Sequence, residues 1–234
     1  MKNFIDKIFS RVNNLDNISL GIKELSSKTP VKKIFQIVNN FSTNSEIRYV
    51  GGCIRKIING EIVDDIDLAT NLSPKEVCNA LKSGNVDFYE TGIDHGTITA
   101  VIGDHKFEVT SLREDVETDG RYAEIKFSTD WKKDASRRDL SINSIYSDLD
   151  GNLFDPFNGK EDLEKGLVKF IGIPEKRIKE DYLRILRYLR FYLVYSKHKH
   201  NPETLKAIKK NLDGISILSK ERLLDELKKL IKSK

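Results

Sequence analysis

Two aspartates separated by a single residue, Asp65 and Asp67, are the first candidates for chemistry in this sequence. On a β-strand, residues two apart project from the same face, so both carboxylates can reach one divalent ion. Mg²⁺ prefers hard oxygen ligands and keeps coordination positions for substrate phosphates. The pattern alone is a weak signal, because residues 148–150 repeat it directly before a Gly-Asn turn, where turn chemistry explains both acids.

A third acid and a glycine pair strengthen the metal interpretation. Glu108 alternates with apolar neighbours in a predicted strand, so we expect it on the face that carries the two aspartates. Gly51 and Gly52 follow a short strand and precede an arginine, and their bare backbone amides are open to a phosphate. A combined phosphate and metal site explains these features better than three coincidences.

Positive charge is concentrated in the C-terminal third. The net charge is +4, but residues 176–210 hold eleven Lys/Arg and three Asp/Glu, a local +8, so the remainder sums to 4 − 8 = −4. A basic block of this kind indicates a polyanionic partner, nucleic acid first. A solvated helix face is the alternative.

Composition excludes several protein classes. With 38% apolar and 32% charged residues, 234 residues can build one or two domains and do not form a disordered tail or a fibrous repeat. No window approaches 18 uncharged apolar residues, and the N-terminus lacks the features of a secretory signal. Two cysteines form no disulfide framework. We expect a soluble protein of a reducing compartment, the cytoplasm, with an organelle as the alternative and no membrane partner.

The apolar pattern changes once along the chain. Short strands alternate with helices up to about residue 154, and beyond Pro156 the pattern is helical. This predicts an α+β fold, in which a head with a mixed β-sheet and flanking helices precedes an all-helical neck. We predict helices near 5–12, 30–41, 73–81, 178–195, from 202 and 219–231, strands at 48–50, 64–68, 97–102, 106–112 and 125–127, and a polar stretch at 13–28.

Eight sequence blocks follow one another along about residues 30–230. They are VGGCIRK…DDIDLAT (50–70), HGTITAV (95–101), FEVTSLRED (107–115), TDGRYA (118–123), RRDLSINSIY (137–146), DPFNGKEDL (155–163), EDYLRILRYLRF (180–191) and SKERLLDEL (219–227). In type and order they resemble the nucleotidyltransferase superfamily. Within it, the chain is similar to class II tRNA nucleotidyltransferases, the CCA-adding enzymes, and to bacterial poly(A) polymerases. The combination of blocks is highly specific.

The resemblance implies a role for each matching residue. Asp65 and Asp67 would bind two catalytic Mg²⁺ ions, with Glu108 as a supporting acid. The implied nucleotide-binding residues are Gly51, Gly52 and Arg55 at the triphosphate, Arg137, Arg138 and Asp139 at the phosphates and ribose, and Asn143, Asp181, Arg184 and Arg187. Arginine suits phosphate because its fork donates bidentately, and a carboxylate can accept from a 2′-hydroxyl. Without the resemblance, the Arg-Arg-Asp run would be an ordinary surface ion pair.

Asp181 and Arg184 lie three residues apart and would share a face of a predicted helix. The resemblance implies that they recognise the Watson–Crick edge of the incoming base. An aspartate accepts from the exocyclic amine of C or A, whereas uracil and guanine present the opposite polarity there and would leave buried groups unpaired. Without the resemblance, the pair would be a salt bridge on a helix surface.

The implied activity is template-independent addition of C, C and A to the tRNA 3′ end from CTP and ATP, with release of pyrophosphate by two-metal in-line transfer. Residues 115–134 match the flexible loop that family members need to switch to ATP, through Asp115, Thr118–Arg121 and Asp134. An A-adding or poly(A)-adding enzyme is the alternative within the family. A non-catalytic RNA-binding module, or one subunit of a split enzyme, is the alternative from a different class.

We predict an N-terminal extension at 1–29, a nucleotidyltransferase head at 30–154 and a helical neck at 155–234. Family members continue into body and tail domains that hold the tRNA, so we expect these domains to be missing here or supplied by a partner chain. The oligomeric state stays open. The family pattern GGxxRD ends in Lys56 instead of an aspartate, which adds positive charge near the predicted phosphate site.

Overall fold

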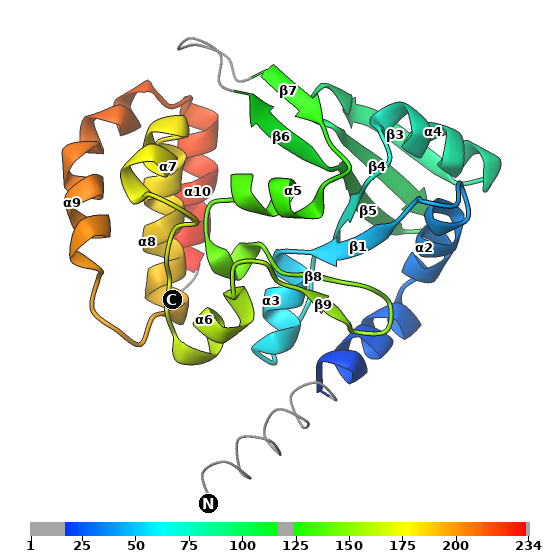
Figure 1. The fold of residues 1–234 in the computed structure, drawn as a ribbon, viewed down its shortest axis with the longest axis horizontal. Coiled ribbons are helices and arrows are strands. Elements are labelled where there is room, and N and C mark those ends of the chain that lie inside the picture. Colours follow the sequence, from blue (N-terminus) through cyan, green and yellow to red (C-terminus); the bar gives the residue numbers. More distant parts are fainter. Residues whose placement is uncertain (1–16, 117–123, 233–234) are drawn as a thin grey trace, which may run out of the picture. The chain divides into compact units, whose positions relative to one another are not determined.

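A computed structural model describes residues 17–116 and 124–232, which form two compact units. The sheet unit contains the chain up to Ala135 together with Ile145–Phe154, and the helical unit contains Ser136–Ser144 together with Asp155–Lys234. The labelled elements (Figure 1) are α2 (Val31–Asn39), β1 (Ile47–Val50), α3 (Gly52–Ile58), β2 (Asp67–Thr70), α4 (Pro74–Ser83), β3 (Asp87–Gly92), η1 (Ile93–His95), β4 (Thr97–Ile102), β5 (His105–Ser111), β6 (Arg113–Val116), β7 (Glu124–Phe127), α5 (Trp131–Arg137), η2 (Ser141–Asn143), β8 (Tyr146–Ser147), β9 (Leu153–Phe154), α6 (Gly159–Lys165), α7 (Pro174–Glu180), α8 (Leu183–Tyr195), α9 (Pro202–Lys210), η3 (Leu212–Ile217) and α10 (Lys220–Lys232).

A seven-stranded mixed sheet forms the middle of the sheet unit, in the order β3-β4-β5-β2-β1-β8-β9. β2 and β5 run parallel, whereas the other neighbouring strands in this order run antiparallel. The strands predicted at 97–102 and 106–112 are present as β4 and β5, which form a hairpin that turns at Gly103-Asp104. β6 and β7 form a separate two-stranded sheet. The predicted α+β fold is confirmed.

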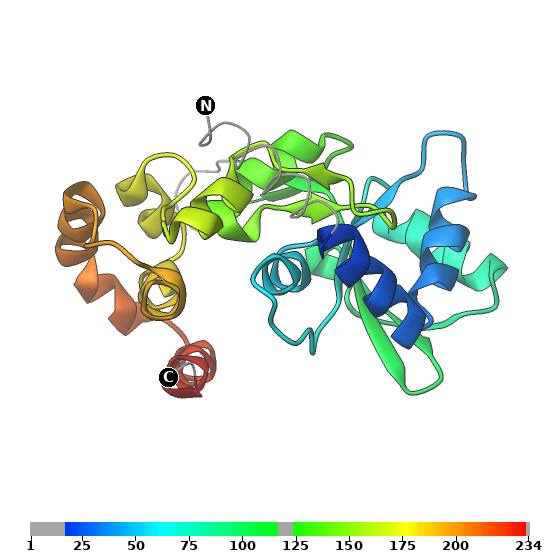
Figure 2. The ribbon, with the colours of Figure 1, turned by 90° about the horizontal axis from the view of Figure 1, so that it is seen from below.

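The hydrophobic core of the sheet unit joins the helices to the large sheet. α2, α3 and α4 lie beside the sheet (Figure 2), and the core contains buried apolar side chains of these helices and of β1, β2, β4 and β5. α2 corresponds to the helix predicted at 30–41 and buries Val31, Ile34, Phe35 and Val38. α4, predicted as a helix near 73–81, begins with a capping box, in which Ser73 Oγ accepts from the backbone N–H of Glu76, and Pro74 opens the first turn.

Residues 17–28 are helical, so the prediction of a polar stretch was wrong there. Ile18 and Ile22 lie one turn apart and are buried in the core, at 2% and 0% exposure. Gly21 lies against α3, because a Cβ at this position would come within 2.6 Å of Ile57 Cγ2. The buried face is narrow and one of its three buried positions is Ser26, so the pattern of apolar residues concealed the helical period.

Strand β3 was not predicted from the sequence. It lies at the edge of the sheet and pairs with β4 along one side. Its side chains include the exposed Tyr89, at 57% exposure, and several acids. An edge strand of this kind lacks the regular alternation of apolar and polar residues that identifies a strand with one buried face.

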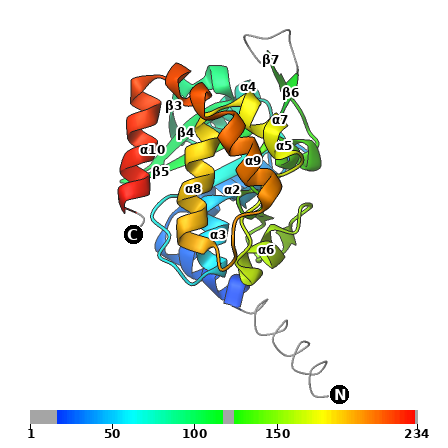
Figure 3. The ribbon, with the colours of Figure 1, turned by 90° about the vertical axis from the view of Figure 1, so that its left-hand side faces the viewer.

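The helical unit is built around α8, which packs against α7 and α10, while α9 packs against α7 (Figure 3). Phe170 stacks on Tyr188 of α8 with the ring centroids 5.4 Å apart. The helix predicted from residue 202 is α9, and it is capped by the Asn201 side chain, which accepts from the backbone N–H groups of Glu203 and Thr204. Along the part of the chain that the structure describes, no helix is long and apolar enough to cross a membrane.

Residues 136–144 group with the helical unit, whereas we had placed the head up to residue 154. Leu140 forms a β-bridge with Phe170, and Ser141 Oγ donates to Asp162 Oδ2 at 2.6 Å. These contacts bind the residues directly after the Arg-Arg-Asp run to α6 and to the segment between α6 and α7.

We predict that Ile22→Ala lowers the free energy of unfolding by about 2–4 kcal/mol, because it leaves a cavity in the core of the sheet unit. Leu20→Ala is the matched control on the same helix, since Leu20 is 61% exposed, and should change it by less than about 0.5 kcal/mol. Urea unfolding measures both. Equal effects of the two substitutions would contradict the packing of this helix.

Candidate active site

The candidate site of the sheet unit contains a pair of acids on adjacent strands. Asp67 begins β2 and is in register with Glu108 of the parallel strand β5. Side chains of directly paired residues project from the same face of a sheet. Glu108 is exposed between Phe107 and Val109, which are buried at 1% and 0% exposure. The two acids therefore lie on the face opposite the core, as predicted for Glu108.

Asp65 lies outside the strand, in the irregular segment before β2, so the predicted strand from residue 64 was wrong. Asp65 is exposed, Ile66 is buried at 8% exposure, and Asp67 is partly buried. Exposed and buried side chains thus still alternate over residues 65–67, although Asp65 is not paired with another strand. Asp65 is held less firmly than Asp67, because it has no ladder hydrogen bonds.

The glycine pair forms the turn between β1 and α3. Gly51 has φ 67° and ψ −111°, a conformation with positive φ that favours glycine. Its backbone N–H donates to the carbonyl oxygen of Ile145 at 3.0 Å, which fixes the turn to the strand region beside it. A Cβ at Gly52 would lie 3.9 Å from Asp67 Oδ2. The predicted phosphate turn and the predicted metal ligand are therefore neighbours, and Arg55 follows in α3 as a buried residue.

Lys56, which departs from the family pattern, forms an ion pair with Asp64. The hydrogen bond from the ammonium group holds the pKa of the Asp64 carboxyl below its usual value. The contact joins α3 to the segment that carries Asp65. The added positive charge at this position is thus used in an ion pair beside the acidic segment.

The acids suit a hard divalent ion. Within residues 17–116 and 124–232, no three His, Cys, Asp or Glu side chains are grouped closely enough to bind a metal by themselves. Asp65, Asp67 and Glu108 nevertheless supply oxygen ligands, and the glycine turn leaves space for a phosphate beside Asp67. This donor set fits Mg²⁺, which usually shares its coordination sphere with water and substrate phosphates.

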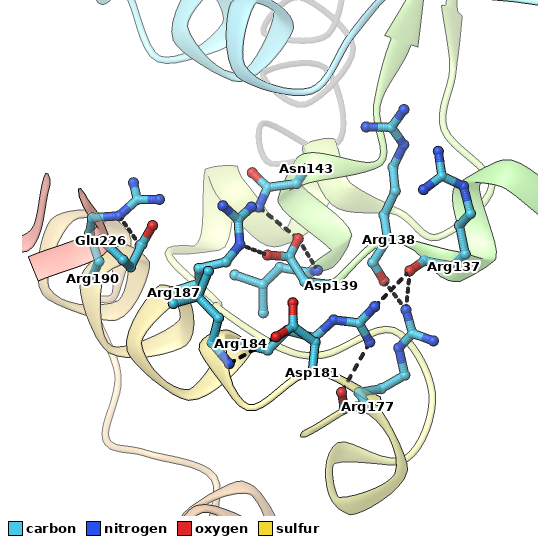
Figure 4. Close-up of polar contacts among 12 residues, drawn as sticks. Arg137, Arg138, Asp139, Asn143, Arg177, Asp181, Arg184, Arg187, Arg190 and Glu226 are labelled. Carbon is cyan, nitrogen blue, oxygen red and sulfur yellow. Dashed lines mark hydrogen bonds and ion pairs between the residues drawn. The ribbon is translucent and has the colours of Figure 1, made fainter. Parts of the chain in front are cut away.

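The helical unit contains a separate candidate site, built around a buried carboxylate (Figure 4). Asp139 Oδ2 accepts from Arg187 Nε at 2.6 Å, and Oδ1 accepts from Asn143 Nδ2 at 3.0 Å and from the backbone N–H of Leu140 at 2.8 Å. Burial opposes ionisation, but the guanidinium charge and these hydrogen bonds lower the pKa of Asp139 to about 2. The structure therefore brings Asp139, Asn143 and Arg187 together, three of the predicted residues.

Two arginines clamp the backbone of the Arg-Arg-Asp segment. Arg177 Nη2 donates to the carbonyl oxygen of Arg138 at 2.7 Å and also to that of Arg137. Arg184 Nη2 donates to the Arg137 carbonyl at 3.3 Å. Glu180 accepts from Arg177 and Arg184 at 2.5 and 2.6 Å. The side chains of Arg137 and Arg138 point away from this clamp (Figure 4), so the backbone is fixed while both guanidinium groups extend outward.

Asp181 lies between two helices, so the prediction that it shares a helix face with Arg184 was wrong. α7 ends at Glu180, Asp181 has extended backbone with φ −160°, and α8 begins at Leu183. Asp181 Oδ1 accepts from the backbone N–H of Leu183 at 3.1 Å, and Oδ2 accepts from Arg222 Nη2 of α10 at 2.7 Å. The aspartate is thus oriented by the start of α8 and by a distant helix.

Sequence reasoning missed Arg177, Glu180 and Arg222. A signal existed for each of them. Arg177 and Glu180 are three residues apart in the basic block, and Arg222 lies in SKERLLDEL, a block to which no role was given. The sequence did not indicate what Arg177 would bind, because its acceptors are backbone carbonyl oxygens.

The predicted loop at 115–134 is only partly covered by the structure. Thr118–Arg121 lie outside the described residues, whereas Asp115 belongs to β6. Asp134 belongs to α5 and is buried at 1% exposure, where it accepts from Tyr146 Oη at 2.6 Å and from the backbone N–H of Arg113 at 3.3 Å. Its carboxylate therefore anchors the beginning of β6 and is part of the packed structure.

Comparison with known families supports the resemblance seen in the sequence blocks. A family model described as "Poly A polymerase head domain" matches residues 47–169, just over half of the chain. The chain belongs to this family. A second model, described as "Probable RNA and SrmB- binding site of polymerase A", matches residues 200–234 of the chain.

CCA-adding enzymes are among the relatives of this chain. It is 49% identical over 191 residues to the human mitochondrial CCA tRNA nucleotidyltransferase 1, covering 80% of this chain and 44% of the relative. The Bacillus stearothermophilus CCA-adding enzyme in complex with CTP matches with a TM-score of 0.74 at 30% identity, over 84% of this chain and 46% of that one. A tRNA nucleotidyltransferase complexed with a primer tRNA and an incoming ATP analogue matches with a TM-score of 0.66 at 26% identity, over 86% and 58%. The chain spans about half the length of the curated relatives it matches.

We predict that Asp139 contributes to stability above pH 4 and that this contribution is lost on acidification. The folded pKa, about 2, lies below the ordinary value of 3.8. The stabilisation is therefore complete above the unfolded pKa and falls by about 2 kcal/mol as the pH drops through the folded pKa. Denaturant unfolding between pH 6 and 2 measures it. Asp139→Asn should be less stable at pH 6 and should show a flatter pH profile, and parallel profiles would contradict the assignment.

Proposed function

We propose that this chain is the catalytic and nucleotide-selecting part of a CCA-adding tRNA nucleotidyltransferase. It would add C, C and A to the tRNA 3′ end from CTP and ATP and release pyrophosphate. The observation that carries this proposal is the in-register placement of Asp67 beside Glu108, next to the Gly51-Gly52 turn. The names of the relatives support it, as do the CTP, ATP analogue and tRNA named in the matching complexes.

At the acids, the chain's own contribution is to hold oxygen ligands and to leave room for phosphate. When bound, Mg²⁺ ions at Asp65 and Asp67 would stabilise the developing charge on the attacking 3′-oxygen and on the pyrophosphate. Asp67 is fixed by its strand, and Glu108 adds a second negative charge beside it. Gly52 places no side chain between Asp67 and an approaching phosphate.

In the helical unit, the chain would select the base by hydrogen-bond polarity. An ionised Asp181 has four acceptor sites on its two oxygens, of which the structure uses two. It can accept from the amine of cytosine or adenine, and it repels the carbonyl that uracil or guanine presents there. Among the described residues, the hydrogen bonds of Arg184 use three of its five N–H groups, so two can serve a base.

The alternatives make different products. An A-adding or poly(A)-adding enzyme is supported by the description of the family, and RNA contact by the C-terminal helices is supported by the model that matches residues 200–234. The cytoplasm stays the predicted compartment, while the human relative's name supports a mitochondrial one.

We expect a tRNA transcript without its CCA end to receive CCA and no further residue when the chain is incubated with CTP, ATP and Mg²⁺. Parallel reactions contain each nucleotide alone, and the ends of all products are sequenced. Products with long A tracts would contradict the proposal and would favour a poly(A) polymerase. If the chain incorporates no nucleotide although it binds the tRNA, the RNA-binding module is favoured.

We expect Asp67→Asn to lower the rate of CMP incorporation by a factor on the order of 10³, because it removes a charge from the phosphate and metal site. The matched control is Asp64→Asn, which removes a neighbouring, exposed charge and should keep the rate within a few fold. Circular dichroism should show the same fold for both variants. A rate loss common to both would contradict a specific role for Asp67.

A further inference from the structure

The orientation of Asp181 depends on a helix that begins almost forty residues further along the chain. α10 runs from Lys220 to Lys232, and its Arg222 donates from Nη2 to Asp181 Oδ2 at 2.7 Å. The backbone N–H of Leu183 binds the other oxygen at 3.1 Å. Each carboxylate oxygen therefore has one partner on a different element, which restricts rotation about both side-chain torsions.

α10 is itself fixed against α8 by a second ion pair. Glu226 Oε1 accepts from Arg190 Nε at 2.6 Å, and Glu226 is buried at 3% exposure. The Arg190 guanidinium also lies over the ring of Phe191, 4.2 Å from its centroid. Arg222 and Glu226 are four residues apart and share a face of α10. The buried pair thus holds Arg222 in position beside Asp181.

The Arg222 contact does not serve mainly to stabilise the fold. The side chain of Arg222 is 51% exposed and that of Asp181 is 29% exposed. Ion pairs that are this accessible to solvent contribute little to stability. Their geometry matters more, because Asp181 lies between helices and has no helical turn of its own to orient it. A base-selecting acceptor must be held in a defined direction, since a rotated carboxylate accepts equally well from water or from the wrong edge.

We propose that Arg222 is a positioning residue for base selection and acts through Asp181, an inference that rests on the proposed function of this unit. Arg222 itself need not touch the nucleotide. Its guanidinium holds one carboxylate oxygen, so that the remaining acceptor sites face the amine of cytosine or adenine. Loss of Arg222 should therefore weaken the discrimination of CTP from UTP more than the binding of CTP.

Equilibrium binding of CTP and UTP to the whole chain tests this without requiring turnover. We expect Arg222→Met to reduce the ratio of CTP to UTP affinity by about tenfold, and Arg222→Lys to restore part of it. Lys229→Met is the matched control, because it removes one positive charge from an exposed position on the same helix. It should leave the ratio unchanged, and thermal unfolding should give similar midpoints for all three variants.

A double-mutant cycle separates positioning from a general effect on the helical unit. If Arg222 acts through Asp181, Arg222→Met should change the ratio no further in an Asp181→Ala background. An additive effect, or an unchanged ratio in Arg222→Met alone, would overturn the inference while leaving the proposed function intact. A wild-type chain that binds CTP and UTP equally would instead overturn base selection by Asp181, and the inference with it.

Discussion

The parallel pairing of β2 with β5 is the constraint on which the acidic part of the site depends. The two strands are separated along the chain by α4 and the antiparallel strands β3 and β4, and their register places Asp67 opposite Glu108. Two acids on adjacent strands repel one another, and a folded protein keeps such a pair where a cation or solvent offsets the charge. A shift of one residue would turn one acid into the core. The register therefore determines which side chains this face carries and which side chains are buried in the core.

In the helical unit, several arginines lie close together, and their positive charges are compensated by specific partners. Arg187 is compensated by the buried Asp139, Arg190 by the buried Glu226, and Arg177 and Arg184 share Glu180. Arg177 and Arg184 also bind backbone carbonyls, which carry partial negative charge without adding acids. The unit can thus remain basic overall and still have an ordered interior, a combination suited to a polyanionic ligand.

Much of this could be predicted from the sequence, because the signals were local. The capping box at Ser73, the β4–β5 hairpin and the placement of Glu108 each follow from residues only a few positions apart. The break at Asp181 could not be predicted, because Ile178 and Ile185, seven residues apart, are both buried and continue the helical period across it. Contacts between Arg177 and carbonyl oxygens were equally hidden, since every residue carries such an acceptor. The roles of the site residues in binding and catalysis stay predictions.

The helix at residues 17–28 gives the glycine turn a mechanical support. Gly21 is in close contact with Ile57 on α3, and α3 begins at Gly52 in that same turn. A larger side chain at position 21 would push α3 away from the helix, and the displacement would travel along one rigid segment to the backbone amides at its start. Sequence variation in a region without any recognisable motif can therefore alter the geometry of the glycine turn. A substitution there would displace the start of α3 even if every recognised motif were intact.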